Sequence, residues 1–368
     1  MTLRYTALDP VHRALGATMT DFAGWDMPLR YGSEREEHNA VRTRAGLFDL
    51  SHMGEIAVTG PQAGELLDHA LVGFVSALGV NKARYTMICA ADGGILDDLI
   101  VYRTGEAEFL VVANASNAQL VLDELTARAE GFDAAVRDDR DAYALIAVQG
   151  PEAAGILAPL TDVPLDGLKY YAGHDGTVAG RRAWVARTGY TGEDGFELFT
   201  AAGDAEAVWT ALASAGEPAG LVPAGLAARD TLRLEAGMPL YGNELGPDMT
   251  PYDAGLGRVV KLDKPGGFVG GAALAERSKA GPERVLAGLT MASRRVPRHG
   301  YPVLAGGQPA GTVTSGAPSP TLGRPIALAY LAPEVVSGNG AVELAVDIRG
   351  RAEPAELTDL PFYRRSRA

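Results

Sequence analysis

A short pattern that occurs twice is the strongest constraint that this sequence places on its fold. Residues 58–63, Val-Thr-Gly-Pro-Gln-Ala, are echoed about 90 positions later by residues 148–153, Val-Gln-Gly-Pro-Glu-Ala. In both copies a strand-like run ends at Gly, Pro is placed to begin a helix, and apolar pairs follow at matching positions. The repeat predicts two related strand-turn-helix units, although so short a match can also arise by chance.

The other patterns predict both helices and strands in the N-terminal part of the chain, and mainly strands in the C-terminal part. Ser33 with Glu36 forms a capping box for a helix that runs to Ala45, with Gly46 as its C-cap. Further helices are expected at about 116–129, 204–215, 225–236 and 271–279, and strands at 55–58, 94–102, 108–113, 183–188 and 196–200. Short strand-like runs after Gly281 predict a separate all-β domain, which makes the fold class α+β.

Charge and cysteine usage exclude several function classes. The net charge is −13 without a dense basic run, so nucleic acid is not an expected partner. The single cysteine, Cys89, excludes an internal disulfide and a four-thiolate zinc site, and favours a reducing, cytoplasmic compartment. No apolar run approaches a membrane span, and residues 1–15 are not expected to act as a signal peptide, because they lack an apolar core. The six histidines are scattered, so no metal is expected.

Common catalytic signatures are also missing. The sequence contains no Gly-x-Ser-x-Gly elbow, no His-Glu-x-x-His, no phosphate-binding Gly-x-x-x-x-Gly-Lys loop and no dinucleotide-binding glycine motif after a strand. The sequence therefore disfavours covalent serine catalysis, nucleotide hydrolysis and dinucleotide redox chemistry.

Two adjacent carboxylates interrupt an apolar strand at residues 93–102, Gly-Gly-Ile-Leu-Asp-Asp-Leu-Ile-Val-Tyr. Neighbouring strand residues point to opposite faces, so Asp97 and Asp98 cannot act as a close acid-base dyad. One of them can face an interior cavity, where burial raises the pKa of a carboxyl group. The alternative interpretation is a turn-capping Asp beside a solvent-facing one.

Glu197 lies in the middle of a strand, between Phe196 and Leu198. An unpaired charge there is costly, so Glu197 should have a partner. The partner is either an arginine of the protein, which the sequence alone favours, or a ligand with parallel N–H donors.

Arg229 and Arg233 lie four residues apart on one side of the helix expected at 225–236. They repel each other unless an anion is near, and a solvated helix face is an equal alternative. His52 and Cys89 are interpreted as buried core residues without a catalytic role.

Together with Asp21–Pro28 and Thr314–Gly323, these segments resemble the T-protein of the glycine cleavage system, a tetrahydrofolate-dependent aminomethyltransferase, from about Tyr5 to Phe362. The resemblance implies three domains in a cloverleaf around a central channel. Residues 1–50 with 141–275 would form the first domain, 51–140 an inserted second domain, and 281–368 a C-terminal β domain with a barrel or jelly-roll-like fold.

The resemblance also implies a reaction in which lipoylated H-protein presents an aminomethyl group and tetrahydrofolate takes up its methylene carbon. Asp98 matches the catalytic carboxylate, Glu197 the pterin-binding glutamate and Arg229 a binding arginine. Pocket-lining positions match Tyr85, Met53, Asn114, Tyr170 and Tyr190, and Arg364, or else Arg365, would hold the distal anionic end of the cofactor.

Three alternatives remain at this stage. A folate-binding relative of the iron–sulfur assembly type is disfavoured, because residues 240–244 lack the cysteine of that family's signature. A stand-alone demethylating folate domain would lack its flavin-binding half. A hydrolase that uses Asp98 and Glu197 as acid and base is the third alternative and is disfavoured.

Overall fold

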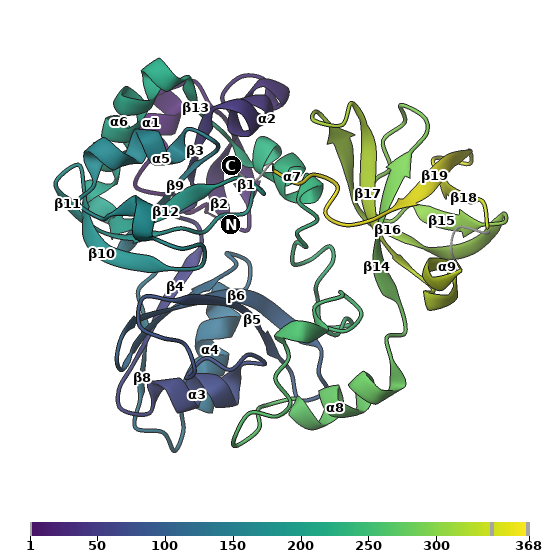
Figure 1. The fold of residues 1–368 in the computed structure, drawn as a ribbon, viewed down its shortest axis with the longest axis horizontal. Helices are drawn as coiled ribbons and strands as arrows, with labels where there is room; N and C mark the ends of the chain where they lie inside the picture. The colour runs from purple at the N-terminus through teal and green to yellow at the C-terminus, as the bar shows by residue number, and fades with distance from the viewer. Residues whose placement is uncertain (1, 339–341, 366–368) are drawn as a thin grey trace. The chain divides into compact units, whose positions relative to one another are not determined.

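The computed structural model describes residues 2–338 and 342–365, and the chain divides into two compact units. The first unit comprises Met1–Ile88 and Asp98–Arg229, and the second comprises Cys89–Asp97 and Asp230–Ala368. In the first unit, two sheets are built from segments that are far apart in the sequence (Figure 1).

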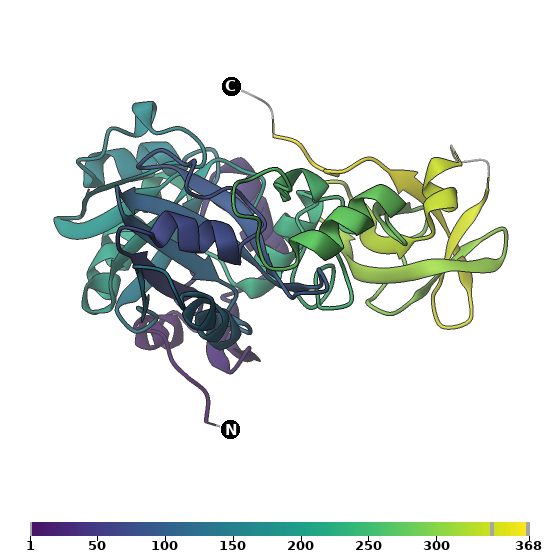
Figure 2. The same cartoon turned by 90° about the horizontal axis from the view of Figure 1, so that it is seen from below.

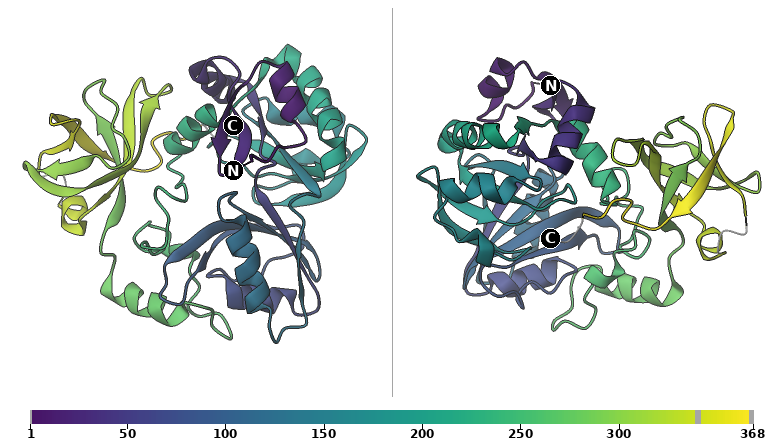
Figure 3. Two further views of the ribbon diagram at one scale, coloured as in Figure 1. Left: turned by 180° about the vertical axis from the view of Figure 1, so that it is seen from behind. Right: turned by 45° about the horizontal axis from the view of Figure 1, so that its top comes forward.

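One sheet, which we call the β9 sheet, has the strand order β10-β11-β12-β9-β3-β13. Its strands are β3 (Ala45–Asp49), β9 (Tyr143–Gln149), β10 (Gly173–Val178), β11 (Arg181–Ala186), β12 (Gly195–Ala201) and β13 (Leu221–Pro223). The strands expected at 183–188 and 196–200 correspond to β11 and β12, which pair antiparallel. Figure 3 shows the N-terminal segment beside the later strands, where β3 pairs with both β9 and β13.

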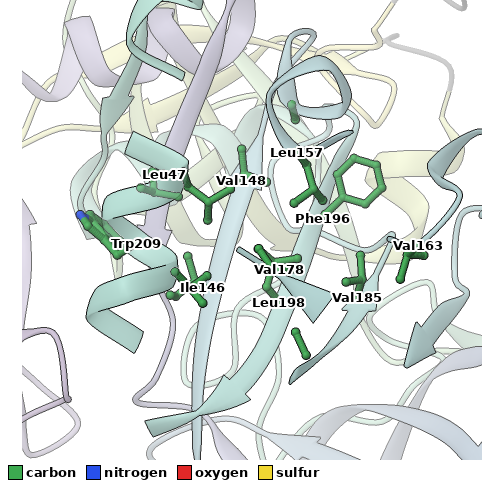
Figure 4. Packing of buried hydrophobic residues seen from close by; sticks show 14 of the residues in the cluster. Leu47, Ile146, Val148, Leu157, Val163, Val178, Val185, Phe196, Leu198 and Trp209 are labelled. Atoms are coloured by element: carbon green, nitrogen blue, oxygen red, sulfur yellow. The ribbon is translucent and has the colours of Figure 1, made fainter. Parts of the chain in front are cut away.

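A buried apolar cluster lies on the face of the β9 sheet that carries Ile146, Val148 and Leu198 (Figure 4). Trp209 of α6 packs into this cluster together with Leu157 of α5. The alternation of strand side chains explains the arrangement, because Phe196 and Leu198 point to this core while Glu197 points to the opposite face. The core thus leaves the other face of the sheet available for a polar site.

The other sheet, which we call the β6 sheet, has the order β5-β6-β7-β4-β8. Its strands are β4 (Gly54–Thr59), β5 (Ala83–Cys89), β6 (Ile95–Gly105), β7 (Glu108–Ala113) and β8 (Ala135–Asp138). Helices α3 (Ala63–Ala70) and α4 (Ala118–Arg128) pack on this sheet (Figure 1). The β1 (Thr18–Phe22) and β2 (Trp25–Arg30) strands form a separate hairpin.

The sequence repeat corresponds to a structural repeat. Gly60 and Gly150 both have positive φ, 122° and 131°, and the amides of Ala63 and Ala153 donate to their carbonyls at 3.0 Å. Only glycine adopts this backbone conformation readily. The correspondence extends to Asn81 and Tyr171, which have φ of 67° and 57°. The two sheets are joined there, because the amide of Ala83 donates to Tyr171 O at 2.9 Å and that of Gly173 to Asn81 O at 3.0 Å.

The expected caps of the first long helix are wrong. Helix α2 is Glu34–Thr43, and Ser33 makes no side-chain cap bond. Glu37 reaches back instead of Glu36, because its Oε1 accepts hydrogen bonds from the amides of Tyr31 and Gly32, which precede the helix, at 2.7 and 3.0 Å. Gly46 lies inside β3, where an added Cβ would stand 2.4 Å from Val41 Cγ2. Gly46 is therefore required for close packing rather than for ending a helix.

The remaining helices lie before, between and after these strands. They are α1 (Asp9–Ala14), α5 (Ala153–Leu157), α6 (Ala205–Gly216), α7 (Leu226–Glu235), α8 (Gly271–Ala280) and α9 (Pro333–Ser337). Single turns of 3₁₀-helix lie at η1 (Ala158–Leu160), η2 (Leu165–Gly167), η3 (Ala202–Asp204), η4 (Glu217–Ala219) and η5 (Gly257–Val259).

In the second unit, α8 precedes a closed barrel with the order β14-β17-β16-β15-β18-β19 (Figure 2). The strands are β14 (Val285–Met291), β15 (Pro302–Ala305), β16 (Gln308–Ser319), β17 (Arg324–Leu331), β18 (Leu344–Asp347) and β19 (Ala352–Thr358). The predicted α+β class with a C-terminal β-barrel is confirmed. The three predicted domain boundaries stay predictions.

A buried ion pair holds the second unit together at the end of α7. Arg233 is 1% exposed, and its Nη1 lies 3.0 Å from Glu244 Oε2 while its Nη2 donates to Ser315 Oγ at 2.7 Å. Arg233 Nε also lies 2.8 Å from Asp230 Oδ1. The predicted alternative of a solvated helix face is therefore wrong for Arg233.

Replacing Arg233 with Ala should lower the free energy of unfolding by about 3–5 kcal/mol, because Glu244 would be left as a buried, unpaired charge. Urea unfolding of the whole chain measures this loss. Arg277→Ala is the matched control, since Arg277 pairs with an exposed Glu283 and its loss should cost about 0–1 kcal/mol. Equal losses in the two variants would contradict the assigned role of Arg233.

Candidate functional site

Asp98 lies on β6 and is held by two neutral donors. Tyr85, from the neighbouring β5, donates its hydroxyl to Asp98 Oδ2 at 3.0 Å. Asn114, immediately after β7, donates through Nδ2 to Asp98 Oδ1 at 2.8 Å and to the carbonyl of Asp98 at 3.1 Å. The three side chains are half-buried. Adjacent strands thus bring together three of the residues that the sequence singled out.

Burial and hydrogen bonding act on Asp98 in opposite directions. Burial raises the pKa of the Asp98 carboxyl from its usual range to about 6, although the hydrogen bonds from Tyr85 and Asn114 lower it. Asp98 is therefore mostly ionised at neutral pH and can still accept a proton. Asp97 is fully buried on the opposite face of the strand. The alternative of a turn cap beside a solvent-facing Asp is wrong for this pair.

Glu197 on β12 is 7% exposed and is held by hydroxyl donors. Its Oε2 accepts from Thr188 Oγ1 at 2.5 Å and from Tyr102 OH at 3.3 Å. Within residues 2–338 and 342–365, no cation lies within 4.0 Å of this carboxylate and no hydrogen bond reaches Oε1. The favoured prediction of an internal arginine partner is therefore wrong.

The sequence analysis missed three residues that surround Glu197 or lie within electrostatic range of it: Tyr102, Thr188 and Tyr171. Tyr102 shares the face of β6 with Asp98, at a spacing of four residues, and reaches Thr188 and Glu197. Burial raises the pKa of the Tyr171 phenol, and Tyr170, Glu197 and Asp98 raise it further, so Tyr171 lies within electrostatic range of both carboxylates. The even spacing of Asp98 and Tyr102 was a usable signal, whereas nothing local marks Thr188 or Tyr171.

Arg229, near the start of α7, lies over the ring of Tyr190, with its Cζ 4.8 Å from the ring centroid. Burial lowers the pKa of the Arg229 guanidinium, while Glu197 raises it. Among the described residues Arg229 forms no ion pair within 4.0 Å, so its charge is available to a ligand. A fully solvated helix face is also wrong for Arg229, which is half-buried.

His52 extends the same site. It is 3% exposed, packs edge-on against Phe22 at 5.4 Å, and its buried Nδ1 has no hydrogen-bond partner among the described residues. Burial lowers the pKa of His52 to about 4, and the charge of Arg229 lowers it as well. The interpretation of His52 as a buried core residue is confirmed, although its Nδ1 has no hydrogen-bond partner among the described residues.

The other predicted site residues occupy more open positions. Met53 is half-buried in the turn after β3, and Tyr170 is 51% exposed with its ring edge-on to Tyr171 at 4.8 Å. Arg364 is exposed and donates through Nη2 to the carbonyl of Leu360 at 3.2 Å. The ligand-binding roles of these three residues stay predictions.

The site offers carboxylates, phenols and one guanidinium, a set suited to an organic ligand with several N–H donors. Across the part of the chain that the structure describes, no group of three or more His, Cys, Asp or Glu side chains is arranged to hold a metal ion. No helix in the described ranges is long and apolar enough to cross a membrane.

Comparisons with known proteins agree over the whole chain. The sequence matches the GCVT N-terminal domain over residues 8–264 and the glycine cleavage T-protein C-terminal barrel domain over residues 284–364. It is 70% identical over 368 residues to an aminomethyltransferase of Streptomyces coelicolor, covering 99% of both chains. A Saccharopolyspora erythraea aminomethyltransferase is 63% identical over 364 residues, again covering 99% of both chains.

A solved structure is similar to the same extent. The crystal structure of glycine cleavage system aminomethyltransferase T from Bartonella henselae matches with a TM-score of 0.91 and 38% identity, covering 98% of each chain.

Asp98 should titrate near pH 6, and Tyr85→Phe should raise its pKa further, because the phenol hydrogen bond that favours the ionised carboxylate is lost. Carboxyl ¹³C NMR follows this titration, and loss of the signal in Asp98→Asn assigns it. An unchanged or lower pKa in Tyr85→Phe would contradict the geometry.

Proposed function

The chain belongs to the glycine cleavage T-protein family and is an aminomethyltransferase, and on this basis we propose that it transfers a methylene carbon from lipoylated H-protein to tetrahydrofolate, with Asp98 as the catalytic residue. The carbon leaves as an aminomethyl group on the dihydrolipoyl sulfur, and ammonia is released. The single cysteine favours the cytoplasm as the compartment.

The reaction needs no protein nucleophile, because amine nitrogens of tetrahydrofolate are the attacking groups. Two C–N bonds to the cofactor form while the C–S bond and the original C–N bond break, and the protons of the two cofactor amines pass to ammonia and the thiol. The chain must therefore supply orientation and electrostatic stabilisation. This requirement explains why the sequence lacks the usual nucleophile motifs.

The observation that carries the proposal is the unfilled acceptor capacity of Glu197. A carboxylate that is 7% exposed, without a cation within 4.0 Å among the described residues, is expensive unless a ligand supplies donors. The 2-amino group and the adjacent ring N–H of a pterin form two parallel donors that suit a carboxylate. Glu197 would accept both, while Thr188 and Tyr102 fix the carboxylate in position.

Asp98 is suited to the step in which a positive charge develops on the substrate as ammonia leaves. Its carboxylate is ionised at neutral pH, so it can orient the reactive pterin amines and stabilise the cation that develops as ammonia leaves. Its pKa of about 6 also allows it to accept a proton and release it. Tyr85 and Asn114 hold the carboxylate for this role.

The remaining residues would line the pocket. Arg229 and Tyr190 form a paired cation and aromatic face, and Met53 and Tyr170 offer further contacts. Arg364, or its neighbour Arg365, would bind the anionic distal end of the folate.

Asp98→Asn should lower kcat for aminomethyl transfer by roughly a factor of 100 or more, because the neutral amide can neither accept a proton nor offset the developing cation. Tetrahydrofolate affinity should be nearly unchanged. Single-turnover assays with loaded H-protein measure the first quantity, and calorimetric titration the second. The control is Asp97→Asn, scored per folded molecule because Asp97 is fully buried. Equal loss of activity in both variants would contradict the assignment.

Glu197→Gln should weaken tetrahydrofolate binding by roughly 10- to 100-fold, because hydrogen bonds to a charged partner contribute about 1.5–3 kcal/mol and each 1.4 kcal/mol is tenfold in Kd. Thr188→Val, which removes only one fixing hydroxyl, should have a smaller effect. The dissociation constant for tetrahydrofolate, measured for both variants, gives the two effects. An unchanged Kd in Glu197→Gln would show that the pterin does not bind at Glu197.

A further inference from the structure

One buried carboxyl group of the first unit has no part in the site described above. Glu55, the second residue of β4, is 1% exposed, and neither of its carboxyl oxygens has a hydrogen-bond partner among residues 2–338 and 342–365. Within the same ranges no basic side chain forms an ion pair with it. An ionised carboxylate without donors is costly to bury, so Glu55 is expected to hold its proton in the folded chain.

The internal repeat shows that a carboxyl group is not required at this position. Gly60 and Gly150 are matching residues of the two copies, so Glu55 of β4 corresponds to Leu145 of β9. The two strands also hold the same place in their sheets, because β4 follows β7 as β9 follows β12. Leu145 is 1% exposed. The second copy thus fills the matching buried position with an apolar side chain.

The side chain of Glu55 faces the β9 sheet. Glu55 and Ile100 both lie opposite Val112 of β7, so Glu55 shares a face of the β6 sheet with the even-numbered residues of β6, among them Tyr102. Tyr102 reaches Glu197 of the β9 sheet from this face. A charge on Glu55 would therefore lie in the same contact region that positions Glu197.

The groups that face Glu55 from other elements are mainly acidic. Burial raises the pKa of its carboxyl well above the usual range, its own backbone amide acts in the opposite direction, and the charges of Asp139, Asp138 and Asp49 raise the pKa further. Tyr143, the first residue of β9, lies within electrostatic range, since burial, Asp139 and Glu55 all raise the pKa of its phenol. Each of the three aspartates already has a basic partner: Arg137 lies 2.6 Å from Asp139, Arg140 lies 2.5 Å from Asp138, and His12 lies 2.8 Å from Asp49.

We propose that Glu55 makes the packing of the two sheets sensitive to pH: its carboxyl stays protonated while the sheets are in contact, and its ionisation at alkaline pH weakens that contact and, with it, the binding site at Glu197. A further negative charge beside three aspartates, without a donor to either oxygen, is stabilised only if water enters between the sheets. Because the folded chain keeps a proton that the unfolded chain releases above roughly pH 4.3, stability falls as the pH rises from there to the pKa of folded Glu55.

Urea unfolding of the full chain between about pH 6 and pH 9 tests the first part of the proposal. Relative to Glu55→Gln, the unfolding equilibrium constant of the wild-type chain should rise about tenfold per pH unit until folded Glu55 ionises. Glu55→Leu, which introduces the residue type found at the matching position of the repeat, should remove this pH dependence as well. The matched control is Glu65→Gln, which removes an exposed carboxyl of α3 and should leave the pH dependence unchanged.

Tetrahydrofolate binding tests the second part, and this readout rests on the proposed function. Between about pH 7 and pH 9 the Kd of the wild-type chain should rise about tenfold relative to that of Glu55→Gln, because only molecules whose sheets are in contact bind the cofactor. Asp98, with a pKa of about 6, is mostly ionised over this range and is present in both proteins, so its titration does not produce the difference.

The two measurements separate the explanations. A ratio of wild-type to Glu55→Gln unfolding constants that stays the same at every pH overturns the inference, because Glu55 would then titrate alike in the folded and unfolded chains. A changing ratio with no relative change in Kd also overturns it, because the proton would not affect the site. If the wild-type chain binds no tetrahydrofolate at any pH, the proposed function fails, and the unfolding comparison alone decides whether folded Glu55 keeps its proton.

Discussion

The contact on which the candidate site depends is the bond of Tyr102 to the buried carboxylate of Glu197. Tyr102 comes from the β6 sheet, and Glu197 and Thr188 come from β12 and the loop before it in the β9 sheet. The same two sheets are joined by the backbone bonds between Asn81, Ala83, Tyr171 and Gly173. Because both connections link the two copies of the repeat, two carboxylates more than 90 residues apart in sequence, Asp98 and Glu197, both raise the pKa of one phenol, that of Tyr171.

The carboxylates of this unit differ in pKa because their hydrogen-bond donors differ. Asp98 has only neutral donors, and burial raises its pKa to about 6. Asp49 is only 3% exposed, yet hydrogen bonds from His12, Ser51 and Thr6, together with the charge of His12, outweigh burial and lower its pKa. Environments that push the pKa values of similar groups apart are the usual means by which one site assigns separate acid, base and binding roles.

In the second unit, buried carboxylates with hydrogen-bond and ion-pair partners stabilise the fold. Glu244 is satisfied by Arg233, and Glu235 by the hydroxyls and amide of the turn at 319–321, so the end of α7 is fixed to barrel strands by buried charge. The carboxylates of the two units, such as Asp98 in one and Glu235 and Glu244 in the other, thus differ in what surrounds them.

The sequence alone determined the α+β class, the late all-β region, the related Gly-Pro turns and the placement of Asp97 and Asp98 on opposite faces of one strand, because strand alternation and glycine backbone freedom are local properties. It failed for the cap of α2, where Glu37 rather than Glu36 reached back, and for the partner of Glu197. Only the tertiary structure decided that Tyr102 and Thr188 serve Glu197, that Arg233 is buried while Arg229 faces Tyr190, and that His52 keeps an unused nitrogen. Those outcomes depend on which strands meet across about 90 residues, and no local pattern carries that information.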